Sequence, residues 1–277
     1  TTGYGTQTAQ VTKRLKRDNH DVAIFSNYGL EGGTTSWSNI PVYQRGADLY
    51  SNDVVPAHMH EWTSRNPKQP HILFTLYDVW VFKGAKWADW NVASWVPIDH
   101  APAPPLVSAW CRQEFVTPIA MSEYGQNVLG TVGVDALYIP HAIEKVFKPT
   151  EKIKNITGRE YIGIDKDKFV VGMNAANKGV SPVRKAFGEN ILAFSIFAQM
   201  HDDAVLYLHT DQLGAFGGIK LMELIASVGL KSHQYKFIDP YLYRQNIEPD
   251  ALAGIYTAMD VLLATSYGEG FGIPTIE

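Results

Sequence analysis

Short, continuous runs of apolar residues recur along the chain and alternate with segments in which apolar residues follow helical spacing. The runs are rich in β-branched and aromatic side chains, which is typical of strands buried on both faces of a parallel sheet. The strands predicted in this way are residues 22–25, 71–76, 92–97, 115–121, 137–139, 169–173, 205–208, 235–238 and 261–264. The predicted helices are residues 8–17, 190–199, 219–228 and 251–259.

This repeated alternation of strands and helices predicts an α/β protein built from doubly wound sheets. A domain boundary is expected in the polar stretch 148–160, which has few large apolar residues and is preceded by Pro140. The prediction is therefore an N-terminal domain of residues 1–149 and a C-terminal domain of residues 150–277, each close to the common domain size.

Composition narrows the classes of function. The chain has 277 residues, of which 45% are hydrophobic, so two domains can each bury a core. The formal net charge is −4 and there is no long basic run, which argues against nucleic acid as a main partner. Cys111 is the single cysteine, so the sequence has neither a disulfide framework nor a cysteine zinc cluster. No apolar run reaches the roughly 20 residues of a transmembrane helix and no signal peptide is evident, so we expect a cytoplasmic protein.

The last segment of the chain, SYGEGFGIPTIE, combines glycines with two carboxylates. Glycines at positions 268, 270 and 272 let the backbone approach a ligand, and a helix starting at Pro274 would direct free amides toward it. Ionised Glu269 and Glu277 can accept strong hydrogen bonds from the hydroxyls of a sugar or a ribose. The alternative is that Glu277 only complements a helix dipole and that Glu269 is solvated.

A cationic loop follows the predicted strand 169–173. Asn174 ends this strand, and the loop then supplies Lys178, Arg184 and Lys185 before the next helix begins. Cations just beyond the carboxyl end of a strand can neutralise a diphosphate and stabilise it as a leaving group. A solvated basic loop is the alternative.

In the N-terminal half, three features are candidates for ligand contact. Gly3 and Gly5 lie in the stretch 2–7, which we expect to be a turn at the entrance of the first helix. His100 follows the strand 92–97, and a loop at that end of a parallel sheet faces a ligand crevice; a surface or packed histidine is the alternative. Asp78 ends another strand and either contacts an acceptor or caps a turn. Trp80, Trp87 and Trp90 either stack on an acceptor or pack in the core.

The segment 266–277 resembles the E-x7-E signature of retaining family 4 glycosyltransferases of the GT-B fold, both in the spacing from Glu269 to Glu277 and in the internal Gly-Phe-Gly. The resemblance implies two Rossmann-like domains that face a cleft. It also implies that Glu269 and the backbone of Gly270, Phe271 and Gly272 hold the donor sugar, and that Glu277 holds the nucleotide ribose. Arg184 and Lys185 are the better match to the family's phosphate-binding pair, although Lys178 also fits. By the same resemblance, Asn174 lies at the family's donor-binding strand end, Gly3 and Gly5 contact donor phosphate, and His100 touches the donor sugar.

The function implied is retaining transfer of a sugar from a nucleotide diphosphate sugar to an acceptor hydroxyl, without metal or cofactor. The predicted catalytic residues are Glu269, His100, Arg184 and Lys185. Asp165-Lys166-Asp167 has the form of a metal motif but precedes a strand, so we expect a solvated turn. Relative to the family, the sequence lacks the first strand and the C-terminal end, so the second domain is expected to be incomplete, with a sheet edge that is exposed or covered by a partner subunit.

Two other functions remain as alternatives. A nucleotide-sugar-binding or scaffolding protein without turnover would use the same donor site. The sequence supports a dinucleotide-dependent oxidoreductase less well, because no G-x-G-x-x-G motif follows a predicted strand.

Overall fold

The structure, a computed structural model, describes residues 3–179, 183–245 and 247–277. It divides into two compact units, Thr1–His141 and Ala142–Glu277. The division falls N-terminal to the boundary predicted at residue 149. The segment after His141 belongs to the second unit, where the amide of Thr150 donates to Oγ1 of Thr257 at 2.9 Å.

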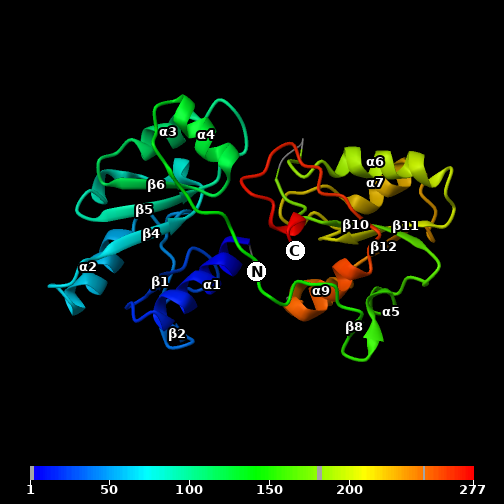
Figure 1. Cartoon of the computed structure of the whole chain (residues 1–277), viewed down its shortest axis with the longest axis horizontal. Coiled ribbons are helices and arrows are strands. Elements are labelled where there is room, and N and C mark those ends of the chain that lie inside the picture. The colour runs from blue at the N-terminus through cyan, green and yellow to red at the C-terminus, as the bar shows by residue number, and fades with distance from the viewer. Residues whose placement is uncertain (1–2, 180–182, 246) are drawn as a thin grey trace. The chain divides into compact units, whose positions relative to one another are not determined.

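The N-terminal unit contains a four-stranded parallel sheet in the order β4-β5-β6-β7, with α3 and α4 on one side (Figure 1). Buried side chains of these strands and helices form one continuous core around Trp87 and Trp110. A second sheet has the order β1-β3-β2, in which β1 and β3 are parallel. The bounds are α1 (Gly3–Arg17), β1 (Ile24–Phe25), β2 (Thr35–Trp37), β3 (Ile40–Tyr43), α2 (Val55–Arg65), β4 (Ile72–Leu76), β5 (Asn91–Val96), α3 (Pro105–Cys111), β6 (Val116–Ala120), α4 (Glu123–Thr131) and β7 (Leu137–Tyr138).

The C-terminal unit is a four-stranded sheet in the order β12-β11-β10-β13, and all its pairings are parallel. One core lies between the sheet and α6 and α7, and a second lies between the other face and α5 and α9, so helices cover both faces (Figure 1). The bounds are β8 (Lys152–Ile153), β9 (Ile156–Thr157), α5 (Gly158–Ile162), β10 (Phe169–Asn174), α6 (Phe187–Ala198), β11 (Ala204–His209), α7 (Leu221–Ser227), β12 (Tyr235–Phe237), α8 (Pro240–Gln245), α9 (Pro249–Thr257) and β13 (Val261–Leu262).

Each predicted strand and helix is present, with ends that differ by a few residues. The prediction of a glycine turn before the first helix is wrong. Gly3 and Gly5 are part of α1 itself, and Thr2 lies outside the described residues. The first four amides of a helix have no intrahelical partner, so a glycine in the first turn loses little hydrogen bonding.

The chain after β13 also differs from its prediction. Instead of an α-helix starting at Pro274, it forms a single 3₁₀ turn, Ile273–Thr275. Within the described part of the chain, no helix combines the length and the apolar character that are needed to cross a membrane.

Candidate functional site

The strand order of the C-terminal unit places the point where the chain changes direction across the sheet between β10 and β13. The chain runs from β10 outward through β11 to β12 and then returns to the opposite side of β10 to form β13. The loops that follow β10 and β13 therefore leave the sheet in opposite directions at its carboxyl edge, which is where open α/β sheets bind ligands. The predicted residues Asn174, Lys178, Arg184, Lys185, Glu269 and Glu277 all lie in or directly after these two strands.

Glu269 is held by side chains from both loops. Arg184 Nη1 lies 2.8 Å from Glu269 Oε2, and Lys185 Nζ forms an ion pair with Oε1. Ser266 Oγ donates to the same Oε1 at 2.7 Å. The amide of Tyr267 donates to the carbonyl of Arg184 at 2.9 Å, which joins the backbones of the two loops. The structure therefore brings together three residues that the sequence had singled out separately.

The charges of this cluster are coupled. Burial raises the pKa of Glu269, but the hydrogen bonds from Lys185, Ser266 and Arg184 outweigh it, so the pKa lies below its ordinary value and the carboxylate stays ionised. Burial lowers the pKa of Lys185, and the ion pair with Glu269 opposes that shift. Lys178 is exposed and lies close enough for its charge to lower the pKa of Lys185. Residues 180–182 of this loop are outside the described residues.

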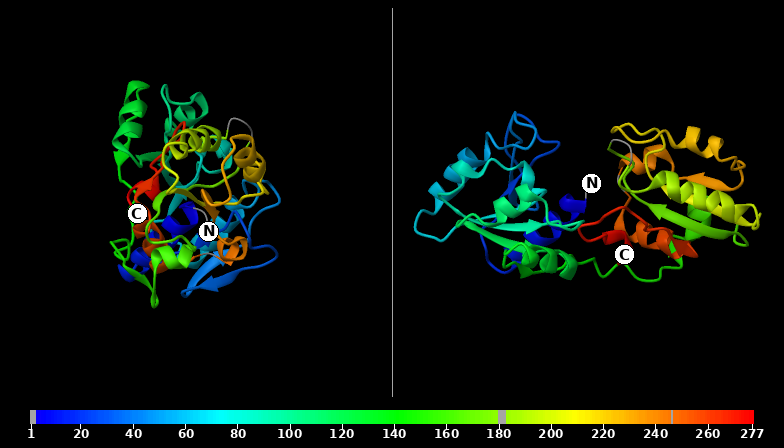
Figure 2. Two further views of the ribbon diagram at one scale, coloured as in Figure 1. Left: turned by 90° about the vertical axis from the view of Figure 1, so that its right-hand side faces the viewer. Right: turned by 90° about the horizontal axis from the view of Figure 1, so that it is seen from above.

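A second polar chain lies at the same edge of the sheet. Asn174 Nδ2 donates to Tyr256 Oη at 2.6 Å, and Tyr256 Oη donates to Glu277 Oε2 at 2.9 Å. The segment ending at Glu277 (red) runs beside α9 (orange), as Figure 2 shows. Burial raises the pKa of Glu277, and the hydrogen bond from Tyr256 opposes this shift. The hydroxyl of Tyr256 thus holds both predicted ligand residues in place.

Sequence reasoning had given no role to Tyr256, Ser266 or Asn190. Asn190 is buried in α6, where its Nδ2 donates to the carbonyl of Thr265 at 3.1 Å and ties the start of this helix to the loop after β13. One signal was present, since Asn190 is a polar residue that directly precedes the apolar run 191–194 of the predicted helix. Such a residue is expected to have a hydrogen-bonding partner when buried.

Gly270, Phe271 and Gly272 are half-buried in the loop after Glu269. Gly272 has φ of 84°, in the left-handed region that favours glycine, and it starts the 3₁₀ turn. A β-carbon at Gly272 would lie 3.8 Å from the Glu269 side chain, so the backbone passes directly beside that carboxylate's stem.

The remaining candidates belong to the N-terminal unit. His100 is exposed in the loop after β5, and its Nδ1 lies 2.7 Å from Asp99 Oδ1. Gly3 and Gly5 lie in the first turn of α1, and Tyr4 between them donates to Asp78 Oδ1 at 3.5 Å. Trp87 is a core residue, whereas Trp80 is exposed.

The motif Asp165-Lys166-Asp167 is an exposed turn before β10, at the amino edge of the sheet. Across residues 3–179, 183–245 and 247–277, no group of three His, Cys, Asp or Glu side chains is arranged to hold a metal ion.

The stability of the C-terminal unit should depend on pH through His209, at the end of β11. Burial lowers the pKa of His209 to about 4, whereas an unfolded histidine titrates near 6.5. Between these values the unfolded chain binds the proton and the folded chain does not, so the free energy of unfolding should fall as pH falls, by up to about 1.4 kcal/mol per pH unit. Urea unfolding at pH 7 and pH 5 should show this slope. It should be reduced in His209→Asn and unchanged in His233→Asn, an exposed control. An equal slope in both variants would contradict this assignment.

No protein-family model matches the sequence, and no curated protein matches it. Solved structures do match the fold. The glycosyltransferase WaaG, which is involved in lipopolysaccharide biosynthesis, is 13% identical with a TM-score of 0.66, over 99% of this chain and 74% of WaaG. A trehalose-6-phosphate synthase studied for glycosyltransfer with retention is 12% identical with a TM-score of 0.60, over 94% and 75%. The E. coli trehalose-6-phosphate protein bound with UDP-2-fluoro glucose is 11% identical with a TM-score of 0.57, over 89% and 71%.

At these identities the likeness establishes the fold. The chain has the GT-B fold of these glycosyltransferases, as the sequence predicted.

Proposed function

We propose that this chain is a retaining glycosyltransferase that moves a sugar from a nucleotide diphosphate sugar to an acceptor hydroxyl. The observation that carries the proposal is the cluster of Glu269 with Arg184, Lys185 and Ser266 in the loops that follow β10 and β13. A cluster of ionised side chains at the carboxyl edge of a parallel sheet is the expected place and chemistry for a phosphorylated ligand.

The charge of the cluster suits a diphosphate. Lys178, Arg184 and Lys185 carry three positive charges and Glu269 carries one negative charge, so a surplus of two remains. A nucleotide diphosphate sugar carries about two negative charges on its diphosphate, and the cations are already positioned before it binds. The first turn of α6 directly follows Arg184 and Lys185, and its free amides add donors for phosphate oxygens.

Glu269 and Glu277 suit the hydroxyl-bearing ends of the donor. Glu269 has one oxygen bound to Arg184 and the other shared by Lys185 and Ser266, so its orientation is set before a sugar arrives. Glu277 is oriented by Tyr256, which in turn is held by Asn174. We assign Glu269 and the backbone of residues 270–272 to the sugar, and Glu277 to the ribose diol.

The proposed chemistry breaks the bond between the anomeric carbon and the diphosphate oxygen. The electron pair leaves with the diphosphate, which Arg184, Lys185 and Lys178 stabilise. The acceptor hydroxyl forms the new bond from the same face, and its proton passes to the departing phosphate oxygen. The trehalose-6-phosphate synthase was studied for glycosyl transfer with retention, and the E. coli protein was bound with a UDP sugar. They support this proposal only through the shared fold. We assign His100 to the donor sugar and Gly3 and Gly5 to the donor phosphate.

A donor screen tests the proposal. We expect one of UDP-, GDP- or ADP-glucose, at about 100 times its dissociation constant, to add about 2.7 kcal/mol of stability in a thermal-shift assay. Lys185→Gln should remove most of this shift. Lys166→Gln, a lysine in the exposed turn at the opposite edge of the sheet, should retain it. A broader panel of nucleotide sugars that gave no shift would refute the donor site, and a shift without release of nucleoside diphosphate would favour binding without turnover.

A further inference from the structure

Four aromatic residues form a partly exposed surface in the N-terminal unit, which we call the aromatic platform. It consists of Tyr28, Tyr50, Tyr77 and Trp80. The ring of Tyr50 lies 6.1 Å from that of Trp80 and 6.3 Å from that of Tyr77, with edge-to-face geometry in both pairs. Tyr28 is 66% exposed and Trp80 is 52% exposed, although large aromatic side chains are usually buried.

The platform lies at the carboxyl ends of strands from both sheets of the N-terminal unit. Tyr28 follows β1, Tyr50 lies in the loop after β3, and Tyr77 and Trp80 follow β4. These are carboxyl ends of strands, the edge at which α/β sheets present ligand-binding loops. The position therefore favours a binding surface over a chance cluster of exposed side chains.

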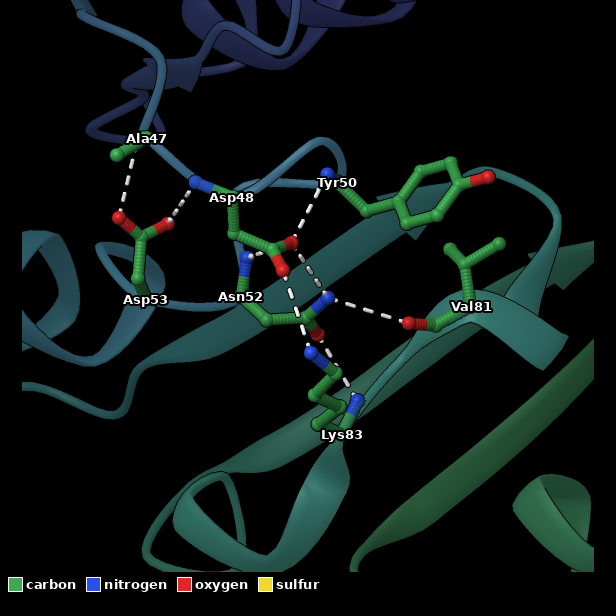
Figure 3. Close-up of polar contacts among 7 residues, drawn as sticks. All are labelled: Ala47, Asp48, Tyr50, Asn52, Asp53, Val81 and Lys83. Atoms are coloured by element: carbon green, nitrogen blue, oxygen red, sulfur yellow. Dashed lines mark hydrogen bonds and ion pairs between the residues drawn. The ribbon is translucent and has the colours of Figure 1, made fainter.

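A polar network holds the platform together (Figure 3). Asn52 Nδ2 donates to the carbonyl of Val81 at 3.1 Å, and the amide of Lys83 donates to Asn52 Oδ1 at 2.9 Å. Asp48 accepts from the amide of Tyr50 at 2.9 Å and pairs with Lys83 Nζ at 3.3 Å. These bonds tie the loop that carries Tyr50 to the segment that carries Trp80, so the backbone on which both rings stand is held in place before a ligand binds.

Electrostatics and packing reinforce this network. The hydrogen bond from the Tyr50 amide, followed by that from the Asn52 side chain, lowers the pKa of Asp48 to about 2, so its charge persists over the physiological range. Asp53 accepts from the amides of Ala47 and Asp48 at 2.9 and 3.2 Å (Figure 3). A β-carbon at Gly46 would come within 2.0 Å of the Asp53 carboxylate, so the loop closes tightly against that side chain.

Polar groups border the aromatic rings. Asp78 follows Tyr77 directly and accepts from Tyr4 Oη at 3.5 Å. Asn27 Nδ2 donates to Tyr77 Oη at 2.8 Å, and Tyr28 Oη lies 3.5 Å from the same oxygen. The surface thus combines exposed ring faces with hydroxyls, an amide and a carboxylate.

We infer that the aromatic platform is the acceptor site and that the acceptor is a saccharide, with a sugar ring stacked on Trp80 and Tyr50 and its hydroxyls bonded to Asp78 and the tyrosine hydroxyls. The assignment of the bound saccharide as the acceptor rests on the proposed function, whereas the binding of a saccharide to this surface does not. A sugar ring presents an apolar C–H face and a rim of hydroxyl donors, which match ring faces and a carboxylate.

Other acceptor classes fit this surface less well. An alkyl chain would desolvate Asp78 and the tyrosine hydroxyls without giving them hydrogen bonds. A phosphorylated acceptor would meet the like charge of Asp78.

Saccharide binding to the 277-residue chain without donor tests the inference. We expect a glycan array to show bound saccharides, and saturation-transfer NMR to confirm one of them in solution. Trp80→Ala should weaken that binding about fivefold, since stacking contributes about 1 kcal/mol. Trp80→Phe should restore most of it. Tyr124→Ala, at a 49% exposed aromatic residue on α4, should leave binding unchanged.

The outcomes separate this inference from the proposed function. Absence of saccharide binding, or equal loss in Trp80→Ala and Tyr124→Ala, would overturn the inference. Dodecyl maltoside and maltose separate an alkyl ligand from a saccharide. If dodecyl maltoside binds, maltose does not, and Trp80→Ala abolishes the binding of dodecyl maltoside, the alkyl chain is the ligand and the inference is overturned in favour of a lipid. Trp80→Ala should keep the thermal shift given by the nucleotide sugar. Loss of saccharide binding with an intact donor shift would therefore support the acceptor site, and a wild type that binds saccharide but no donor would refute only the proposed function.

Discussion

Replacing Glu269 with glutamine should lower the turnover number of sugar transfer by about two to three orders of magnitude, the effect expected when a preorganised electrostatic group is removed from an active site. Glutamine keeps the shape of the side chain but cannot balance Arg184 and Lys185, both of which bind the carboxylate. The cations lose the partner that positions them, and a donor sugar hydroxyl loses a charged acceptor.

The measurement is the release of nucleoside diphosphate under saturating donor and acceptor, with KM determined for each. Glu223→Gln is the matched control, because Glu223 is exposed on α7 and forms an ion pair with Lys220, far in sequence from the cluster. Comparison with Lys185→Gln and with the double variant should give a coupling energy of about 0.5–3 kcal/mol, because the two residues share one network. Wild-type turnover in Glu269→Gln would show that this cluster takes no part in the reaction.

Replacing Phe187 with alanine should destabilise the C-terminal unit by about 3–5 kcal/mol. Phe187 is the first residue of α6, and its side chain is completely buried in the core between this helix and the sheet. Truncation leaves a cavity that the neighbouring side chains fill only in part. Because Arg184 and Lys185 directly precede this helix, the same change should also weaken donor binding.

The distribution of tryptophan makes this prediction specific to one unit. All seven tryptophans lie between Trp37 and Trp110, so tryptophan fluorescence reports the N-terminal unit, whereas circular dichroism reports both. In urea, Phe187→Ala should shift a transition seen by circular dichroism and leave the fluorescence transition in place. Leu192→Ala, a 52% exposed position on the same helix, should change stability by no more than about 0.5 kcal/mol. An equal shift of both signals would mean that the two units unfold as one.

The short-range pattern of the sequence determined the fold class and part of the secondary structure. Buried parallel strands need continuous apolar runs, and these runs identify the strands of the two four-stranded sheets from residues that are neighbours in sequence. The strands β2 and β3 were not predicted. The pattern also determined the location of the candidate site, since Glu269 and the cationic loop follow strands, and the carboxyl ends of parallel strands meet at one edge. Where local signals were ambiguous the prediction was wrong, as at Gly3 and Gly5, because glycine is allowed both in a turn and in the first turn of a helix.

Only the tertiary structure decided which side chains meet. Asn174 and Tyr256 are 82 residues apart, and their hydrogen bond exists because β13, which follows α9, pairs with β10 and not with β12. Tyr50 and Trp80 likewise come from separate loops that Asn52 joins. Hydrophobic periodicity carries no information about strand order or about which loops pack together. These contacts depend on how whole elements bury their surfaces. The sequence could therefore identify Glu269 and Trp80 as candidates, but only the tertiary structure shows which residues they contact.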